Sequence, residues 1–469
     1  MQAHSSTEGA ALAPARAAPG PSGLPFFGQT AAAWRDPIGL FLRSQAAHGD
    51  VVRLRFGPFD YFLVNDVAAI KRVLVDNAAN YEKSRSYAGL RVLLGEGLLT
   101  SEGEFWRRQR RLAQPAFHRE RLAALAGAMA AEVERMRGRW AGLGPGAPVD
   151  VHAEMMRLTF AIVGRALLSA DLDGDASAVG EALGVCLAWA NRYVESFAPA
   201  PLWVPTPSNL RFRRARRTLD ALVYRVIAER RGRGEPGDDL LGMLMAASVE
   251  GGAMSDRQLR DELLTLVLAG HETTANLLAF AFHALSSHPH WRAELEGEVD
   301  AALAGRAPGF DDLPRLRLTR AALDETLRLY PPVWTFERQA KAPDVLGGFR
   351  VPKGSLVGIA PYVLHRHPAH WADPEGFDPT RFLPERAAAR HKFAYLPFGG
   401  GPRTCIGNAF ALTEATIVLA MVLQRHRLER DPARPLRLDP AVTMRPAGGL
   451  FCRLYARAQG SSKAATTAS

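Results

Sequence analysis

The chain has 469 residues, of which 47% are hydrophobic and 23% charged, an ordinary balance for a globular protein of one large domain or two or three average ones. The chain has three cysteines, Cys186, Cys405 and Cys452. A small and odd number of cysteines argues against a disulfide framework and fits a reducing compartment. No cluster of cysteine and histidine predicts zinc, because His271-Glu272 lacks the second histidine of a zinc-binding helix at position 275.

The net charge of +10 is compatible with nucleic acid, an anionic membrane or an acidic protein as partner, and equally with an arginine-rich surface that only aids solubility. No basic stripe interleaved with aromatic residues marks a nucleic-acid module. The segment 1–22 is rich in Ala, Pro, Gly and Ser, and it has neither a membrane-spanning stretch nor the apolar core of a signal peptide. We expect a disordered tail over 1–22, a folded domain over 23–458, a polar tail over 459–469, and a cytoplasmic protein without a membrane anchor.

The folded part opens with two predicted strands, 51–56 and 60–64, joined at Gly57-Pro58, and a predicted helix over 67–77. Farther on, Trp106 and Arg110 stand four residues apart, so they share one face of a helix. There the arginine could hydrogen-bond an anion while the indole packs. The alternative is a solvated basic face, and the neighbouring Arg107, Arg108 and Arg111 could form a basic docking surface.

The middle of the chain is rich in helix formers, with helices predicted over 183–197 and 219–230. Ser255 and Gln258 have the spacing of a capping box, and the apolar helical pattern that follows runs to about Ser287, long enough for a helix of roughly 45 Å. Its centre, residues 269–274, reads Ala-Gly-His-Glu-Thr-Thr. Polar side chains there compete with the helical hydrogen bonds and could open a local groove, or they could form a harmless polar stripe.

Two further strand pairs are predicted near the C-terminal end, 347–352 with 355–360, and 442–444 with 450–454 through a turn at 446–449.

Before these strands, Glu325 and Arg328 lie three residues apart on a helix that ends at Pro331-Pro332. Such a pair is usually a surface contact that contributes only tenths of a kcal/mol.

The most informative stretch runs from Phe398 to Gly407, a glycine-rich loop that ends at Cys405 and leads directly into an apolar helix. A cysteine at a helix N-terminus lies in the positive end of the peptide dipole, which lowers the pKa of the thiol. The three glycines let backbone N–H groups approach the sulfur, and Arg403 adds a positive charge. The pattern predicts a stabilised thiolate suited to a metal, and its alternative is a buried structural cysteine.

This stretch resembles the heme-binding signature of the cytochrome P-450 family, Phe-x-x-Gly-x-Arg-x-Cys-x-Gly, at every fixed position. The resemblance extends over most of the chain and implies a mainly α fold with small β-sheets and one heme b. The Cys405 thiolate would then be the axial ligand of the iron, whose electron donation favours cleavage of the O–O bond. The resemblance implies these cofactor-binding residues: Trp106, Arg110, Arg338, Phe398, Gly401, Arg403, Cys405 and Gly407.

The other motifs match in the same order along the chain. Trp106, Arg110 and Arg338 would bind the heme propionates, although Gln109 stands where many relatives have histidine. Glu272 and Thr273 would be the catalytic pair, with Thr273 hydrogen-bonded to dioxygen and Glu272 relaying protons. A structural ion-pair network would join Glu325, Arg328 and Arg381, the last in a Pro-Thr-Arg-Phe sequence where the family usually has Pro-Glu-Arg-Phe.

The resemblance implies a monooxygenase that uses O2, and the expected pocket lining is apolar, which favours a terpene, fatty acid, steroid or polyketide. That lining comprises Tyr87, Leu268, Ala269, Val333, Trp334, Phe336 and Leu450. Since no flavin or dinucleotide module is evident, electrons would come from an acidic ferredoxin with its NAD(P)H-dependent reductase, to which a basic monomer is suited. Two alternatives remain, a heme-thiolate enzyme that uses peroxide or isomerises its substrate, and a non-catalytic heme-binding sensor.

Overall fold

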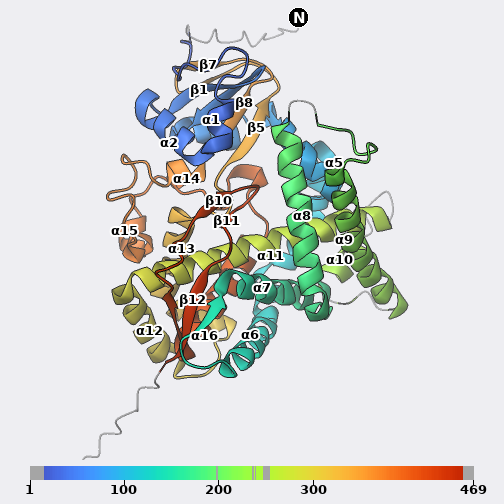
Figure 1. The fold of residues 1–469 in the computed structure, drawn as a ribbon, viewed down its shortest axis with the longest axis vertical. Coiled ribbons are helices and arrows are strands. Elements are labelled where there is room, and N and C mark those ends of the chain that lie inside the picture. The colour runs from blue at the N-terminus through green and yellow to red at the C-terminus, as the bar shows by residue number, and fades with distance from the viewer. Residues whose placement is uncertain (1–14, 197–198, 235–236, 238, 247–253, 458–469) are drawn as a thin grey trace, which may run out of the picture. The chain divides into compact units, whose positions relative to one another are not determined.

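The structure is a computed structural model that describes residues 15–196, 199–234, 237, 239–246 and 254–457 (Figure 1). The chain forms two compact units, each described by itself below. The first unit comprises Met1–Arg85, Thr335–Leu364 and His391–Arg403, and the second comprises Ser86–Trp334, His365–Arg390 and Thr404–Ser469. The mainly helical architecture with small sheets confirms the fold class predicted from the sequence.

The first unit is built on a five-stranded sheet with the order β1-β2-β8-β5-β3. Its first two strands form an antiparallel hairpin at the predicted place, and Gly57, with a φ of 57°, makes the turn that an L side chain would strain. β2 and β8 run parallel, and β5 pairs antiparallel with both β8 and β3. The strand bounds are β1 Val51–Phe56, β2 Phe59–Val64, β3 Tyr81–Lys83, β5 Phe336–Ala340 and β8 Leu356–Ile359.

One predicted strand pairing in this unit is wrong. Strand β7 (Phe349–Val351) pairs with β6 (Asp344–Leu346), and not with β8, which joins the large sheet. Gly347 and Gly348 have φ values of 56° and 82°, so the chain reverses before β7 and brings β6 back against it. The whole of β8 is buried, which places it inside the sheet and away from the hairpin.

The α-helices of this unit are α1 (Thr30–Arg35), α2 (Pro37–His48) and α3 (Val67–Lys71) in its N-terminal segment, and the short α14 (Pro361–Leu364) after β8. The helix predicted over 67–77 is α3 followed by one π-helical turn over Arg72–Asp76. The predicted tail needs correction over 15–22, because Arg16 pairs with Phe349 and the Pro19 carbonyl accepts a hydrogen bond of 2.7 Å from the Arg53 N–H. The rest of that tail, residues 1–14, and the predicted tail 459–469 lie outside the described residues.

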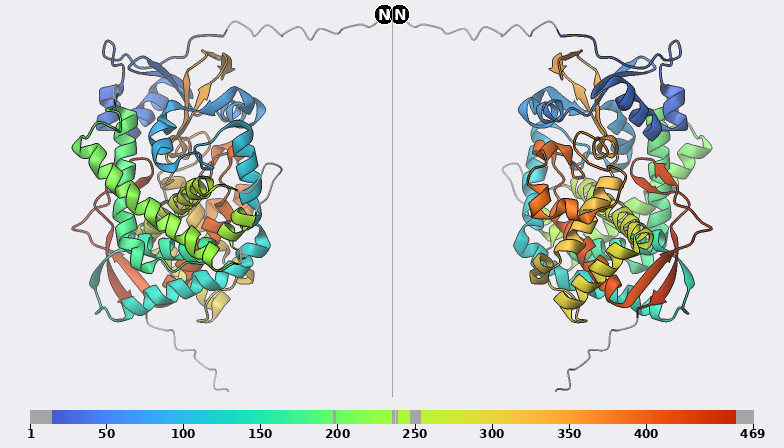
Figure 2. Two further views of the ribbon diagram at one scale, coloured as in Figure 1. Left: turned by 90° about the vertical axis from the view of Figure 1, so that its right-hand side faces the viewer. Right: turned by 90° about the vertical axis from the view of Figure 1, so that its left-hand side faces the viewer.

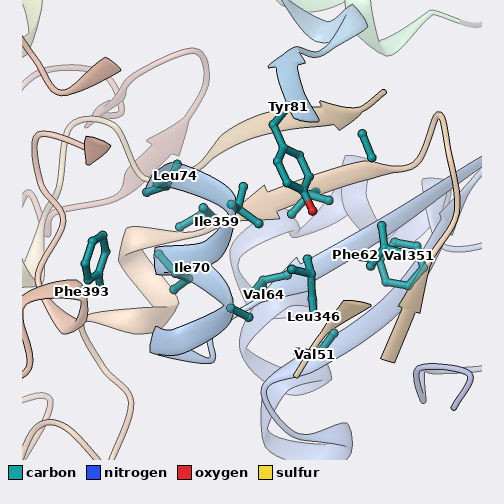
Figure 3. Packing of buried hydrophobic residues seen from close by; sticks show 14 of the residues in the cluster. Val51, Phe62, Val64, Ile70, Leu74, Tyr81, Leu346, Val351, Ile359 and Phe393 are labelled. Carbon is teal, nitrogen blue, oxygen red and sulfur yellow. The ribbon is translucent and has the colours of Figure 1, made fainter. Parts of the chain in front are cut away.

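The core of the first unit forms between the sheet and α3 (Figure 3). Phe62 and Val64 of β2 meet Ile70 of α3, and Leu346 and Val351 of the small hairpin close the same cluster. Phe62 and Val64 stand two residues apart and therefore share one face of β2, and the strand is buried on both faces from Tyr61 to Val64.

The second unit is helical and has α11 (Asp256–Ser287) at its centre, packed against α7, α9, α13 and α16 (Figure 1). The predicted capping box is confirmed, since Ser255 Oγ accepts the Gln258 N–H at 3.2 Å and Gln258 Oε1 accepts the Ser255 N–H at 3.0 Å. Most of α11 is buried. The other helices are α4 (Ala88–Leu94), α5 (Gly103–Ala113), α6 (Arg119–Ala141), α7 (Val151–Leu168), α8 (Ala176–Glu195), α9 (Pro207–Gly232), α10 (Leu240–Ala246), α12 (Pro289–Leu303), α13 (Arg317–Leu329), α15 (Pro384–Ala387) and α16 (Asn408–Arg425).

Within the described part of the chain, α11 is the one helix long and apolar enough to cross a membrane, and most of that stretch is buried in the protein. A buried core helix meets the same criteria of length and composition as a membrane span. The packing therefore accounts for its hydrophobicity.

Two small sheets complete the second unit, and they correct the other predicted pairing. β12 (Phe451–Ala456) pairs with β4 (Ala147–Asp150) and β9 (His426–Arg430), as Figure 2 shows for β12 and β4, whereas β11 (Met444–Pro446) pairs with β10 (Leu438–Pro440). The predicted turn at 446–449 therefore connects two sheets. Beyond it, the Leu450 N–H donates to Asp150 Oδ1 at 3.0 Å, and this contact directs β12 onto β4.

Candidate active site

The glycine-rich loop crosses from one unit to the other, and its first part, up to Arg403, belongs to the first unit. Gly399 and Gly401 have φ values of 68° and 67°, in the left-handed region that favours glycine. A Cβ at Gly401 would lie 1.9 Å from the Leu74 carbonyl oxygen. Only glycine therefore permits this close approach of the loop to the preceding π-helical turn.

Cys405 stands just before α16 in the second unit and is an exposed residue. The Gly407 N–H donates to the sulfur, and the charge of Arg110 also favours the thiolate. Desolvation is nevertheless the largest effect and raises the pKa of the thiol, so the lowered pKa predicted from the helix dipole is wrong. A metal ion would reverse this balance, because coordination deprotonates a thiol outright.

The donor set around Cys405 fits a metal that arrives with ligands of its own. Among the residues that the structure describes, no group of three or more His, Cys, Asp or Glu side chains could hold a metal ion. A single cysteine sulfur, supported by one N–H and one arginine, is the donor set that an iron porphyrin needs from a protein.

Two of the predicted propionate ligands are desolvated arginines without a carboxylate partner. Arg110 lies 5.9 Å from the ring of Trp106 on α5, and burial lowers the pKa of its guanidinium. In the first unit, Arg338 on β5 is only 9% exposed, and its Nη1 donates to the Glu337 carbonyl at 2.8 Å. Neither arginine forms an ion pair with any described residue. Each is therefore suited to an anionic group of a bound cofactor.

The centre of α11 presents a short accessible stripe on an otherwise buried helix. Ala269, Gly270 and Thr273 are accessible or partly so, while the residues on either side of the stripe are buried. Thr273 Oγ1 donates to the Ala269 carbonyl at 2.5 Å, and the helix continues without a break. The groove considered from the sequence is thus an exposed face of intact helix with one hydroxyl on it.

Glu272 points away from this stripe into a polar cluster that the sequence did not indicate. Its carboxylate accepts the Thr443 hydroxyl at 2.6 Å and lies 3.9 Å from Arg445, which in turn pairs with Asp439 at 2.9 Å. Burial raises the pKa of Glu272, and Thr443 and Arg445 oppose the rise. The carboxyl group is thereby able to hold or release a proton next to Thr273. Thr443 escaped prediction because its only signal was a strand pattern far along the chain.

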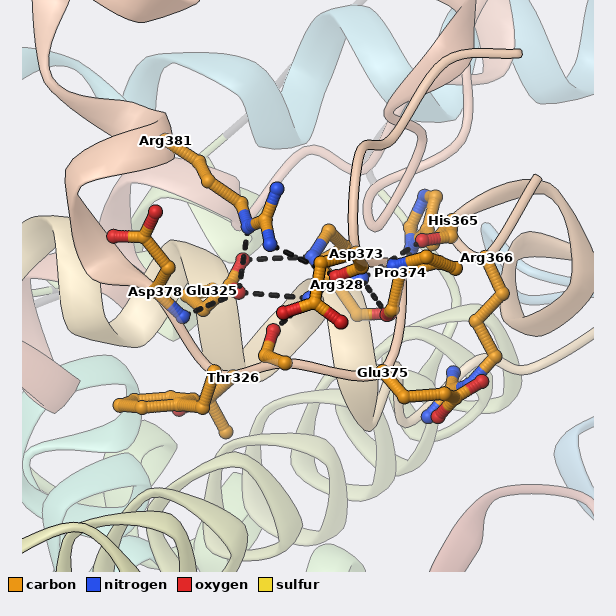
Figure 4. Close-up of polar contacts among 12 residues, drawn as sticks. Glu325, Thr326, Arg328, His365, Arg366, Asp373, Pro374, Glu375, Asp378 and Arg381 are labelled. Atoms are coloured by element: carbon orange, nitrogen blue, oxygen red, sulfur yellow. Dashed lines mark hydrogen bonds and ion pairs between the residues drawn. The ribbon is translucent and has the colours of Figure 1, made fainter. Parts of the chain in front are cut away.

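The ion-pair network of the second unit contains the three predicted residues (Figure 4). Glu325 is fully buried, with Arg381 Nε at 3.3 Å and both of its oxygens 2.7 Å from Arg328 nitrogens. Arg328 is also fully buried and uses its remaining N–H donors on three carbonyl oxygens, those of His365, Pro374 and Gly376. The network fastens α13 to the irregular segment 365–381.

The predicted pocket residues differ in accessibility. Ala269 is exposed, whereas Leu268, Trp334 and Leu450 are buried, and Trp334 Nε1 donates to the Ala441 carbonyl at 2.9 Å. The other three, Tyr87, Val333 and Phe336, are half-buried. Phe336 belongs to the first unit and the other six to the second.

Comparison with known proteins identifies the class of the site. Residues 18–453 match the family model of the cytochromes P450. The chain is 41% identical to cyclooctatin synthase of Streptomyces melanosporofaciens over 90% of this chain and 92% of that protein. It is 38% identical to cyclooctat-9-en-7-ol 5-monooxygenase of the same organism, over 89% and 90% of the two chains. Pentalenene oxygenase of Streptomyces avermitilis is 36% identical, over 94% and 97%.

The chain therefore belongs to the cytochrome P450 family and is an oxidoreductase with a heme-iron cofactor. The relatives named as oxygenases support the monooxygenase class.

Proposed function

We propose that the protein is a monooxygenase that inserts one oxygen atom from O2 into a C–H or C=C bond of a terpene. The observation that carries this proposal is the nearly full-length similarity to enzymes of cyclooctatin and pentalenene chemistry. The apolar stripe of α11, interrupted by one hydroxyl, fits a hydrocarbon substrate better than a charged one. The sequence alone is also compatible with fatty acids, steroids and polyketides, and a fatty acid and a steroid serve as comparison ligands in the test below.

The residues present suit heme b. Cys405 would bind the iron, and Trp106, Arg110 and Arg338 would bind the propionates, since both arginines are desolvated and lack carboxylate partners. When bound, the heme supplies the activation of O2 and the transfer of one oxygen atom to the substrate. Phe398, Gly401, Arg403 and Gly407 would shape the loop that presents the sulfur.

Thr273 and Glu272 would deliver protons. The Thr273 hydroxyl is accessible on the helix surface and is held by the Ala269 carbonyl, so its oxygen is oriented as a hydrogen-bond acceptor toward the open side. Glu272, whose pKa burial raises, can donate a proton and recover one through the polar cluster at Thr443 and Arg445.

Electrons would come from an acidic ferredoxin and its reductase. On α5, Arg107 and Arg111 are exposed and Arg108 is half-buried, and of these Arg107 is paired with Glu104 of the same helix. Opposite charges steer such encounters and make their rate fall with ionic strength. Charge reversal at Arg111 is therefore expected to slow electron transfer from the ferredoxin and to leave substrate binding unchanged.

The test is a titration of the purified ferric holoprotein with pentalenene, a fatty acid and a steroid, followed in the Soret band. A spin-state shift with pentalenene and a weaker or absent shift with the others supports the proposal. If the fatty acid or the steroid alone shifts the band, the terpene assignment is refuted and the monooxygenase assignment stands. Product analysis with a ferredoxin and reductase, against a peroxide control, then identifies the reaction.

A further inference from the structure

A cluster of large apolar side chains lies on the surface of the first unit, between residues 24 and 34. Leu24 is 59% exposed, Phe26 84%, Phe27 54% and Trp34 60%. Most other large hydrophobic residues of the described chain are buried. Four such side chains within one short segment form an exposed apolar patch, which in a soluble protein marks an interaction site. We call residues 24–34 the apolar loop, and from Thr30 on this segment is part of helix α1.

The apolar loop is held in place by its backbone. The Leu24 and Gly28 main chains exchange two hydrogen bonds of 3.0 and 2.8 Å, and the Phe27 carbonyl accepts the Thr30 hydroxyl at 2.6 Å. The Gln29 N–H donates to the Arg55 carbonyl at 2.8 Å, which fastens the loop to β1. The display of the side chains is therefore a property of the fold.

Phe26, at the tip, adopts a φ of 63°. Bulky residues rarely occupy this left-handed region, where glycine or asparagine would be at ease. A ring that is 84% exposed gains little packing within the protein to offset this strain. The conformation is explained if the ring is buried against something outside the chain.

The rim of the apolar loop is positive. Arg35 ends α1 and Arg55 lies on β1 next to Gly28 and Gln29, and both are exposed without an ion pair to any described residue. The nearby acids are neutralised, since Asp36 pairs with Arg43 at 3.0 Å and Asp60 with Arg53 at 2.8 Å. Aromatic side chains beside uncompensated arginines are the composition of segments that rest in the headgroup region of anionic bilayers.

We propose that the apolar loop, Leu24, Phe26, Phe27 and Trp34 rimmed by Arg35 and Arg55, docks on an anionic lipid bilayer. A protein partner would need some 20–30 residues a side and a complementary shape, whereas three side chains from one short loop and Trp34 from the helix that follows it offer about a fifth of that. A bilayer needs no complementary shape, and apolar side chains that reach its acyl boundary suffice for reversible binding. This inference is independent of the reaction proposed above.

The experiment is co-sedimentation of the full-length holoprotein with vesicles of phosphatidylcholine, with and without phosphatidylglycerol. We expect binding to the anionic vesicles that weakens as salt is added. The variant Phe26→Ser/Trp34→Ser is expected to lose roughly tenfold or more of the partition coefficient. Arg35→Gln/Arg55→Gln is expected to lose the preference for phosphatidylglycerol. The control Leu143→Ser, at an apolar residue 45% exposed in the second unit, is expected to bind like the parent.

Phe26→Asn separates docking from folding. Asparagine tolerates the left-handed backbone, so this variant is expected to melt at a higher temperature while losing vesicle binding. An unchanged Soret spectrum verifies the fold of every variant. Equal binding by the parent and Phe26→Ser/Trp34→Ser, or no binding by the parent, refutes the proposal. So does concentration-dependent dimerisation that this double variant abolishes in the absence of lipid binding, which would assign the loop to a second copy of the chain.

Discussion

Arg328→Leu removes the guanidinium at the centre of the buried ion-pair network. In the native protein its five N–H donors are all used, two on Glu325 and three on the carbonyl oxygens of His365, Pro374 and Gly376. The substitution leaves the Glu325 carboxylate buried with only Arg381 at 3.3 Å and the Asp378 N–H at 2.9 Å. We expect a large loss of stability, since a buried charge would lose its main partner.

The magnitude follows from these contacts. Removing one partner of a buried pair costs about 3–5 kcal/mol, and each carbonyl left without a donor adds to it if water cannot reach the site. Because Arg381 retains part of the compensation, we expect about 3–5 kcal/mol in total, a large share of a typical stability of about 5–15 kcal/mol. Arg328→Lys keeps the charge but has only three donors, and we expect a loss of about 2 kcal/mol.

The assay is urea unfolding of the parent and variants, followed by far-UV circular dichroism and by tryptophan fluorescence, whose coincidence establishes two-state behaviour. The matched control is Arg320→Leu on the same helix, where the arginine is 47% exposed and pairs with Asp324 at 2.9 Å. That variant is expected to lose at most about 0.5 kcal/mol. A loss below about 1 kcal/mol for Arg328→Leu, or equal losses at the two positions, would show that burial of the network contributes nothing beyond a surface pair.

Four further variants each change a single side chain. Cys405→Ala is expected to abolish monooxygenation with an unchanged far-UV circular dichroism spectrum. Retained activity would show that the Cys405 sulfur is not the required ligand of the iron. Thr273→Ala is expected to lower product formed per NAD(P)H consumed, whereas Glu272→Gln lowers the turnover rate; normal coupling in the first would exclude the hydroxyl from proton delivery. Burial raises the pKa of Glu262 from 4.5 to about 7, so the unfolded chain loses this proton first and stability falls as the pH rises through that range. Glu262→Gln, which keeps an acceptor for the Leu98 N–H, is expected to stabilise the protein by about 2 kcal/mol more at pH 8 than at pH 5, and a pH-independent effect would contradict the raised pKa.

Several parts of the fold and the site follow from the sequence because they depend on neighbours along the chain. The capping box of Ser255 is a contact across three residues, and the hairpin at Gly57 depends on one glycine turn. Both strand pairings that were predicted wrongly had joined strands that follow one another in the sequence. The glycine pair before β7 selected β6 as its partner, and a long-range hydrogen bond from Leu450 to Asp150 selected β4 for β12.

The chemistry of the site shows the same division. The sequence indicated Cys405 and Glu272, yet it gave the wrong direction for the thiol pKa, since the dipole and Arg403 are visible in the sequence and desolvation is not. It also missed Thr443 and Arg445 around Glu272, because nothing in a strand pattern indicates which distant carboxylate a hydroxyl will meet.

The amino-acid sequence by itself therefore determined the family signature, the long central helix, the caps and turns, and the identities of the ionisable groups. The tertiary structure alone decided which strands pair and which arginines are desolvated without a carboxylate partner. It also decided that the Phe26 side chain is exposed on a strained backbone. The reason is physical: backbone preferences and contacts within a turn act over a few residues, whereas burial and long-range pairing depend on every element that packs around a site.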